Sequence, residues 1–504
     1  MKIVLWDTRH GGAFKDFAGG FGVGQFRGTS LRGKIIEHFY RNDYRSPSLA
    51  FGYLAAGLRK AGHAVEYSLE ATPQAEVYIF NPALMTVNHE AAVMRQLNQR
   101  SPKTRLLVVG QVASTMPECF DGIRCKVLKG EPEQLIPKFE DVVASSEKNI
   151  DIGTVSNLDE LPFPDWSAFP YKKFRVNYDF WKFPTAYIQS SRGCTLSCSY
   201  CPYIILENKV RTRAPELVVE EMRRGMETYG FQSFKFRDPL FGARKKHAEE
   251  LAERIGKLPR KVQFSVESRI ELLSRETLEM LRNVGLTSVT VGIETPSLET
   301  LKKYKRAPIK DDKQSQFVDL CRGLGIRVIS GFMIGFPEDT TETIRNVLKY
   351  AKRVNPFGAN FNVCTPYPGT AFINEITEQI ESRDWSRYDV YTPNLKYDNF
   401  TTEEMHAWHQ KCFNSYYFRW KYLKLNWQFF FPRLHAMTSI FTGSAAMAKT
   451  AMVKRSLATN ASVSAAPQPI SVLPIVTQPA AATPCCSSDQ TCEPHEPSPA
   501  SKVA

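Results

Sequence analysis

The chain has 504 residues, 43% hydrophobic and 12% aromatic, a composition that suits about two or three globular domains and excludes a mainly disordered protein. The opening MKIVLWDTRHGG has no apolar run long enough for a signal peptide, and no later window approaches a transmembrane span. We therefore expect a cytoplasmic protein. Its eleven cysteines are too sparse for a disulfide framework, which leaves thiolates available for metal chemistry.

Positive charge is concentrated toward the carboxyl end. The formal net charge is +13, and no acidic residue occurs between Glu404 and Asp489. The basic residues of that interval are Lys411, Arg419, Lys421, Lys424, Arg433, Lys449, Lys454 and Arg455. Nucleic acid would suit this balance, but no recognition module for it is present, so it is not an expected partner.

The first part of the chain alternates apolar runs with amphipathic stretches. Strands are expected at 2–7, 64–70, 75–81, 105–113 and 125–131, and helices at 46–63 and 88–99. This order predicts a doubly wound parallel sheet within residues 1–150, with ligands beyond the carboxyl ends of its strands. The long loop at 8–45 is either a backbone-lined ligand site or a flexible lid, and it contains Gly11, Gly12, Gly19, Gly20, Gly22 and Gly24.

A second series of strands and helices follows a linker. Residues 151–184 include a proline-rich stretch without helical period, which is typical of a connection between domains. Within 185–375, helices are expected at 215–229 and 244–257 and between the later strands, and strands at 185–190, 233–238, 261–268, 288–294, 327–335 and 359–368. Six parallel strands with outer helices predict a partial (β/α)6 barrel, whose chemistry lies at the carboxyl ends of the strands.

The end of the chain is predicted to be helical over 376–445. Thr401 with Glu404 three residues later fits a capping box that opens a helix. The aromatic and basic stretch 413–434 has two interpretations. It is either a helix packed on the barrel or an interfacial segment with Trp420, Trp427 and Phe429 to Phe431 at the inner face of an anionic membrane.

The last residues, 446–504, are predicted to be a disordered, low-complexity tail. Their composition turns to Ala, Ser, Pro and Thr without periodicity. Cys485, Cys486 and Cys492 in this tail are interpreted as unstructured thiols.

Three cysteines carry the strongest chemical signal. Cys194, Cys198 and Cys201 form a C-x3-C-x2-C run within SRGCTLSCSYCPY, with no fourth cysteine nearby. A structural zinc site closes with four protein ligands, and a simple iron–sulfur cluster also takes four thiolates. Three thiolates leave one metal corner open. The alternative is a zinc or plain iron–sulfur site that recruits a distant cysteine such as Cys321 or Cys364.

This cysteine run, with Tyr200 before its last cysteine, resembles the defining motif of the radical S-adenosylmethionine (SAM) enzymes. The resemblance implies that Cys194, Cys198 and Cys201 hold a [4Fe–4S] cluster, with Tyr200 beside the bound cofactor. In that family the methionine part of SAM chelates the fourth iron, so the open corner would be the substrate-activating site.

The later strands resemble the same family one by one. FKFRDPLF places Asp238 near the methionine amine, and FSVESRIELL places Arg269 where it could pair with the methionine carboxylate. VTVGIET implies that Glu294 lies near the ribose hydroxyls. GFMIGFPEDT implies backbone contact with adenine around Ile334 and Gly335.

The front part resembles the cobalamin-binding domain that precedes the barrel in many radical SAM enzymes. The segments SLAFGYLAAGLRKAGHAVE, LLVVGQVAS and VLKGEPEQLIPKF carry this likeness, which extends over about residues 1–440. One feature departs from other cobalamin proteins. Asp7 and His10 stand three apart, so the D-x-H-x-x-G motif that supplies an axial histidine is absent, as it also is in several cobalamin-binding radical enzymes.

The resemblance implies a cobalamin-dependent radical SAM enzyme, with methyl transfer to an unactivated carbon as the first hypothesis. The alternatives are a cobalamin-independent radical cyclase, oxidase or carbon–carbon coupling enzyme, and, from another class, an iron–sulfur or cobalamin sensor without turnover. The expected partners are a small-molecule or lipid-like substrate and a low-potential electron donor such as flavodoxin or ferredoxin. No acid or base catalyst is assigned.

Overall fold

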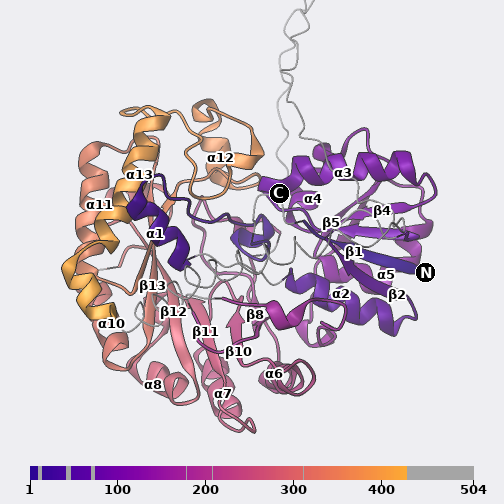
Figure 1. The fold of residues 1–504 in the computed structure, drawn as a ribbon, viewed down its shortest axis with the longest axis horizontal. Helices are drawn as coiled ribbons and strands as arrows, with labels where there is room; N and C mark the ends of the chain where they lie inside the picture. The colour runs from indigo at the N-terminus through magenta and orange to yellow at the C-terminus, as the bar shows by residue number, and fades with distance from the viewer. Residues whose placement is uncertain are drawn as a thin grey trace, which may run out of the picture. The chain divides into compact units, whose positions relative to one another are not determined.

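The computed structural model describes residues 1–8, 14–40, 47–69, 74–176, 179–206, 208–309 and 311–427, and these belong to one compact unit, Met1–Leu434. Figure 1 shows the two groups of strands and the helices around them. His10, Gly11, Gly12, Phe429 to Phe431 and the predicted tail with its three cysteines lie outside the described residues.

The front sheet is parallel throughout, in the order β2-β1-β3-β4-β5-β6. The runs of β1 and β3 are almost wholly buried, as expected for strands covered on both faces. The strands are β1 (Lys2–Trp6), β2 (Ala64–Ser68), β3 (Val77–Phe80), β4 (Arg105–Val108), β5 (Lys126–Gly130) and β6 (Asn149–Gly153). The helices of this part are α1 (Leu31–Tyr40), α2 (Leu49–Lys60), α3 (Val87–Arg100), α4 (Gln111–Thr115) and α5 (Leu135–Ala144).

Three details differ from the sequence predictions. The predicted strand 105–113 ends at Val108, because Gly110 turns the chain at φ +91° and α4 begins at the next residue. The loop predicted over 8–45 contains α1, and the sequence reading missed both α5 and β6. β6 begins one residue before the predicted domain boundary at 150, and the boundaries themselves stay a prediction.

The second sheet is also parallel, in the order β14-β13-β12-β11-β10-β7, and its two end strands do not pair with each other. Its strands are β7 (Thr185–Ile188), β10 (Ser233–Phe236), β11 (Gln263–Ser268), β12 (Leu286–Glu294), β13 (Arg327–Ile334) and β14 (Gly358–Val363). Its helices are α6 (Pro215–Tyr229), α7 (Lys245–Ile255), α8 (Arg275–Asn283), α9 (Leu298–Lys303), α10 (Asp311–Gly323) and α11 (Thr341–Val354). This is the partial barrel predicted from the sequence, and the predicted fold class is confirmed.

A small antiparallel ribbon encloses the cysteine run. It consists of β8 (Ser191–Arg192) and β9 (Arg211–Thr212), in which Ser191 pairs with Thr212 and Arg192 with Arg211. The three cysteines therefore lie on a loop whose two ends are tied together directly after β7.

The chain closes with α12 (Ala371–Glu375) and α13 (Thr402–Tyr417). The predicted capping box is present, since Glu404 N donates to Thr401 Oγ1 and Thr401 N donates to Glu404 Oε2. Phe413 and Tyr417 are buried, and Ala359 N of β14 donates to the Tyr417 hydroxyl at 2.7 Å. The start of the aromatic stretch therefore packs on the barrel, as the first interpretation held.

Among the described residues, no helix has both the length and the apolar character needed to cross a membrane.

Candidate active site

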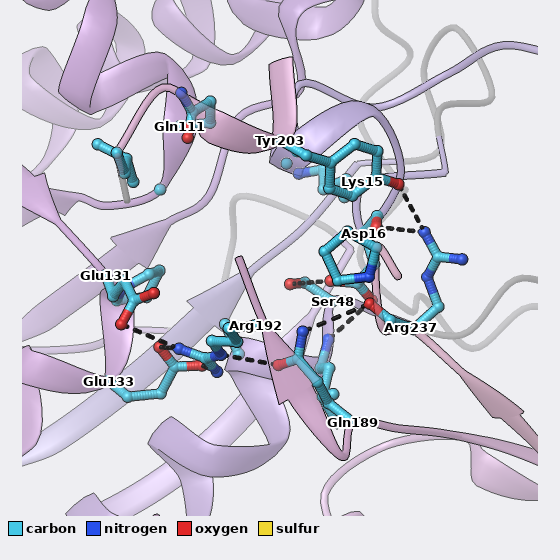
Figure 2. Close-up of a pocket in the computed structure, with 18 of the residues that line it drawn as sticks. Lys15, Asp16, Ser48, Gln111, Glu131, Glu133, Gln189, Arg192, Tyr203 and Arg237 are labelled. Carbon is cyan, nitrogen blue, oxygen red and sulfur yellow. Dashed lines mark hydrogen bonds and ion pairs between the residues drawn. The ribbon is translucent and has the colours of Figure 1, made fainter. Parts of the chain in front are cut away.

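The carboxyl ends of the two sheets border one cavity of about 180 Å³, which we call the inter-sheet cavity (Figure 2). From the front sheet it is lined by Asn81 after β3, Gly110 and Gln111 after β4, and Glu131 and Glu133 after β5. From the barrel it is lined by Gln189 after β7, Arg192 and Gly193 at the cysteine loop, and Arg237 and Pro239 after β10. The expected ligand positions of the two folds thus coincide in one space.

The glycine-rich loop forms a wall of this cavity through Lys15, Asp16, Gly19 and Gly20. Gly19 has φ +63°, and a Cβ there would lie 2.5 Å from the carbonyl oxygen of Pro202, next to the last cysteine. Only glycine satisfies both demands without strain. The loop therefore rests directly on the cysteine loop.

Buried ion pairs hold the front sheet to the ribbon. Arg192 lies 2.8 Å from Glu133 Oε1 and 3.3 Å from Glu131 Oε2, and Arg211 lies 2.8 Å from Glu131 Oε1. Figure 2 shows Arg192 reaching toward both carboxylates. Although burial acts to raise the pKa of Glu131, the two guanidinium groups hold it below its ordinary value. Since Arg192 and Arg211 are the ribbon's paired residues, these contacts fix the cysteine loop against the front sheet.

The three cysteines lie within electrostatic range of one another. Burial raises the pKa of Cys201 to about 12, and the nearby Cys198 and Cys194 add to this effect. In the part of the chain that the structure describes, no group of three histidine, cysteine or acidic side chains is placed to hold a metal ion. A cluster differs from a single ion because its thiolates bind different irons and so need not converge on one point.

Cys321 and Cys364, the two distant cysteines considered as a fourth ligand, are not placed at the cysteine loop. Burial alone raises the pKa of Cys321, to about 12, and Cys364 is buried after β14 beside acidic groups, among them Asp339 and Glu294. The described residues thus supply three thiols at this loop and no fourth.

Polar atoms without a protein partner surround the cysteine loop. The hydroxyls of Ser199 and Tyr200 and Nη1 of Arg269 are buried and make no hydrogen bond within the described residues. Unmet buried donors and acceptors are costly unless a ligand satisfies them. Their presence beside three thiols fits a cluster with a polar organic molecule bound to it.

Glu294 occupies the end of β12 in a left-handed conformation, φ +66°. Its carboxylate lies 3.2 Å from Arg306 Nη2, and burial raises its pKa even though Arg306 and Arg269 act to lower it. The charge of Glu294 also acts on the hydroxyl of Tyr200. Glu294, Arg269 and Tyr200, which the sequence singled out separately, are therefore neighbours.

The predicted adenine segment is held by a carboxylate. Gly335 N and Phe336 N both donate to Asp339 Oδ2, at 2.7 and 3.0 Å, and the ring of Phe336 lies 6.3 Å from that of Tyr200. Ile334 is fully buried at the end of β13. Asp339 thereby fixes the turn through Gly335, which has φ +79°.

Asp238 is already engaged by the protein. Its carboxylate accepts from Ser190 N at 2.8 Å and from the hydroxyls of Ser190 and Ser191. These serines lead into the cysteine loop, so Asp238 positions the start of that loop. Its predicted contact with the methionine amine stays a prediction and would have to share these oxygens.

Sequence reasoning missed Arg306 and Gln111. Arg306 Nη1 lies 3.9 Å from Cys198 Sγ, but YKRAPIK belongs to no strand end or known motif. Gln111 lines the inter-sheet cavity with its Nε2 buried and without a partner, and the predicted strand through residue 113 concealed it. The one sequence signal that could have indicated Gln111 was Gly110, which precedes it and ends the strand.

Comparison with known proteins identifies the barrel. Residues 188–351 match the model of the radical SAM superfamily, so this part of the chain is a radical SAM domain. Among curated proteins, an uncharacterized methyltransferase of Pyrococcus horikoshii is 27% identical over 275 residues, covering 53% of this chain and 58% of the relative. The hopanoid C-3 methylase of Methylococcus capsulatus is 26% identical over 381 residues, covering 69% and 72%.

A third relative is the anaerobic magnesium-protoporphyrin IX monomethyl ester cyclase of Cereibacter sphaeroides, 25% identical over 350 residues and covering 67% of this chain and 56% of the relative. The chain thus spans little more than half of the Pyrococcus and Cereibacter proteins.

Two solved structures share the fold. The radical SAM methyltransferase TsrM of Kitasatospora setae, with cobalamin and a [4Fe–4S] cluster bound, matches with a TM-score of 0.53 at 17% identity, covering 75% of this chain and 78% of that one. The cobalamin-dependent radical SAM enzyme OxsB, with aqua-cobalamin and SAM bound, gives 0.58 at 13% identity, covering 81% and 65%. The predicted fold class is confirmed, and the match over residues 188–351 supports the predicted family and enzyme class.

Proposed function

We propose that the protein is a cobalamin-dependent radical SAM methyltransferase that modifies an unactivated carbon. The observation that carries this proposal is the inter-sheet cavity, where the cysteine loop meets the carboxyl ends of the front sheet. Relatives named as methyltransferase and methylase support it, as do two solved structures of the same fold with cobalamin bound.

The residues present fit the groups that this function requires. Cys194, Cys198 and Cys201 would hold the cluster, and the unpartnered hydroxyl of Tyr200 and Nη1 of Arg269 would meet SAM together with Glu294. The rest of the Arg269 guanidinium is already engaged by Glu271 and the carbonyl of Ala307. Gln111 Nε2 would meet the corrin from the front sheet. When bound, the reduced cluster with SAM supplies a 5′-deoxyadenosyl radical, and cobalamin supplies the methyl group.

The chain's own residues would prepare this chemistry in several ways. Arg306 Nη1 donates to Cys198 Sγ at 3.9 Å, a contact that would help to hold this cluster ligand in position. The ion pairs of Arg192 and Arg211 keep the cysteine loop and the front sheet together, which helps to exclude water from the space between them.

Purification without oxygen, after expression with cobalamin supplied, tests the proposal. We expect about four irons and about one cobalamin per chain, and formation of 5′-deoxyadenosine when the protein is reduced in the presence of SAM. If the protein binds iron and forms 5′-deoxyadenosine but holds no cobalamin, cyclisation, oxidation or coupling would replace methyl transfer as the proposed reaction. Iron without any 5′-deoxyadenosine would contradict an enzyme and favour a sensor.

A radical cyclase is the second candidate, because the Cereibacter relative that covers two thirds of this chain is named as a cyclase. The two candidates differ in the fate of the second cofactor. Methyl transfer predicts bound cobalamin, whereas a cobalamin-independent cyclase would leave the inter-sheet cavity to other ligands.

The proposed electron donor is a low-potential flavodoxin or ferredoxin. A cluster of this kind receives one electron at a time, and its potential is low because thiolates bind it. Reduced flavodoxin should support formation of 5′-deoxyadenosine in the absence of chemical reductant, and failure of both donors would remove them as partners.

A peripheral membrane contact is proposed for the surface formed by α1 and the end of the described chain. Trp420 and Leu31 are each 80% exposed and Trp427 is 56% exposed, and Lys421 and Lys424 lie between the tryptophans. Arg32 lies over the ring of Phe418, which places the two segments together. Aromatic rings with lysines suit anionic lipid. The protein should therefore sediment together with anionic vesicles and not with neutral ones. The double variant W420A/W427A should bind the anionic vesicles more weakly.

A further inference from the structure

A second cavity, of about 230 Å³, lies against the inner wall of the barrel, and we call it the barrel cavity. Its strand side includes Thr290 of β12, Gly331 of β13, and Asn360 and Asn362 of β14. Its other side is formed by rings from the glycine-rich loop and from α13. None of these residues lines the inter-sheet cavity.

The glycine at position 331 creates the room. Gly331 stands beside Gly292 of β12 and Asn360 of β14 in the sheet register. A Cβ on Gly331 would meet only Asn362 Nδ2, at 3.6 Å, which is an ordinary contact. Its φ lies outside the left-handed region, so the backbone does not demand glycine. The missing side chain therefore serves the cavity.

Aromatic rings cover the opposite side. Phe26 of the glycine-rich loop stacks on Phe413 of α13, with ring centroids 4.1 Å apart and planes 23° apart. Phe17 lies over the guanidinium of Arg237 at 3.7 Å. These rings line the same cavity as the strand residues, and aromatic side chains favour contact with another flat ring.

The polar groups of the barrel cavity are uncharged or already neutralised. Glu267 pairs with Arg237 and Lys235, and Glu37 pairs with Lys34 at 3.3 Å. No lysine or arginine lines this cavity among the described residues. An anionic ligand would therefore find no unpaired cation in the lining to receive it, which disfavours it.

Hydrogen-bonding capacity is nevertheless available. Within the described residues, the side chains of Thr290, Asn360 and Asn362 make no hydrogen bond, so two amides and one hydroxyl are free to meet a ligand. A ligand with a carbonyl, hydroxyl or ring N–H would satisfy them.

The strand wall of the barrel cavity is connected to the cysteine loop through one neighbouring residue of β12. Gly292, the register partner of Gly331, accepts from Arg306 Nη2 at 2.7 Å, and Arg306 Nη1 is the group 3.9 Å from Cys198 Sγ. Arg306 therefore links the strand beside Gly331 to a predicted cluster ligand.

We propose that the barrel cavity binds the acceptor substrate, and that this acceptor carries an uncharged, flat ring system with a hydrogen-bonding group read by Asn360, Asn362 and Thr290. The proposal rests on the proposed function. It names the class of molecule that the radical would meet.

Equilibrium dialysis with a matched pair of probes tests it. N-phenylnaphthylamine is an uncharged ring compound, and anilinonaphthalene sulfonate has the same rings with one negative charge. The iron-loaded protein should bind the neutral probe at one site and the sulfonated probe about ten-fold more weakly. Equal binding of both, or no binding of the neutral probe, would overturn the proposed class.

Two graded variants locate the site. Gly331→Leu fills the barrel cavity and should reduce binding of the neutral probe about ten-fold, and Gly331→Ala should reduce it less. Gly323→Leu adds the same side chain at a position with nothing within 4 Å and should leave binding unchanged. Gly331→Ala keeps the test valid if the leucine variant does not fold. Unchanged binding in both Gly331 variants would reject this site.

Formation of 5′-deoxyadenosine is measured on the same samples without substrate. Cleavage of SAM with no probe binding would reject this inference alone, whereas probe binding without cleavage would reject the proposed function alone.

Discussion

Arg306 and Cys198 are in contact across 108 residues of sequence, with Arg306 Nη1 3.9 Å from Cys198 Sγ. The same guanidinium pairs with Glu294 at 3.2 Å. A single cation therefore links a predicted cluster ligand to a predicted SAM-binding carboxylate. Because both Arg306 and Glu294 are largely buried, their charges act on one another with little screening.

Removing the guanidinium should weaken both folding and SAM binding. Arg306→Ala leaves Glu294 buried without a partner, so we expect the free energy of unfolding to fall by about 3–5 kcal/mol and the affinity for SAM to fall about ten-fold. Arg306→Lys keeps the positive charge but loses the planar guanidinium. Its unfolding free energy and its affinity for SAM should lie between those of the parent and of Arg306→Ala. Urea unfolding and SAM dialysis measure these effects.

The matched control is Arg275→Ala on α8, which breaks an exposed ion pair with Glu279 at 3.4 Å. Exposed pairs contribute little, so its unfolding free energy should stay within about 0.5 kcal/mol of the parent. Equal losses in the Arg306 and Arg275 variants would show that the buried position has no special role.

The cysteine loop gives the most direct prediction about the cluster. Cys198→Ala should abolish the visible absorption of the cluster and all formation of 5′-deoxyadenosine, because two thiolates do not retain it. Cys119→Ala, a half-buried thiol of the front part, should leave both unchanged. A Cys198 variant that still cleaves SAM would remove the cluster from this loop.

Local sequence signals predicted the fold well where one segment decides its own structure. Helix α6 begins at Pro215 and ends before Gly230, whose φ is +71°, and the predicted bounds 215–229 match it. Helix α1 had no such signal. It lies inside a glycine-rich loop, and contacts such as Thr29 N to Gln410 Oε1, 381 residues away, help to hold it in place.

For the candidate site too, the sequence indicated residues that a local pattern marks and missed those that depend on contacts in the folded chain. The cysteines, Glu294 and Gly335 were singled out because each stands at a strand end or in a spaced motif. Arg306 was missed because its role depends on Cys198 and Glu294, which come together only in the folded barrel. Asp238 was singled out, but no pattern could show that two serines before the cysteine run already occupy its carboxylate.

Asp339 predicts a specific dependence of stability on pH. Burial raises the pKa of this carboxyl from 3.8 to about 6, although bonds from Thr343, Phe336 and Gly335 act to lower it. The folded protein therefore binds more protons than the unfolded chain between these values. The contribution of Asp339 to the free energy of unfolding is most favourable below about pH 4. It falls by about 2–3 kcal/mol as the pH rises through about 6.

Asp339→Asn should remove this dependence. The amide oxygen can accept from Gly335 N and Phe336 N, and the amide nitrogen can donate to Thr343. Relative to the parent, the variant should gain about 2–3 kcal/mol of unfolding free energy between pH 4 and pH 7, as measured in urea. Asp319→Asn, at an exposed residue of α10, controls for the loss of one negative charge. A constant difference between the Asp339 variant and the parent across this range would contradict the assignment.

Comparing alanine variants of Gly19, in the glycine-rich loop, and of Gly62, outside it, separates the cost of backbone strain from the cost of crowding. Both have positive φ, +63° and +89°, so alanine should cost about 1–2 kcal/mol of unfolding free energy at either position. A Cβ at Gly62 meets nothing within 4 Å, whereas at Gly19 it would lie 2.5 Å from Pro202 O. Gly19→Ala should therefore cost more than Gly62→Ala and, by displacing the cysteine loop, should lower the iron bound per chain. If both variants lose the same stability and keep the same iron content, the glycine-rich loop does not bear on the cysteine loop.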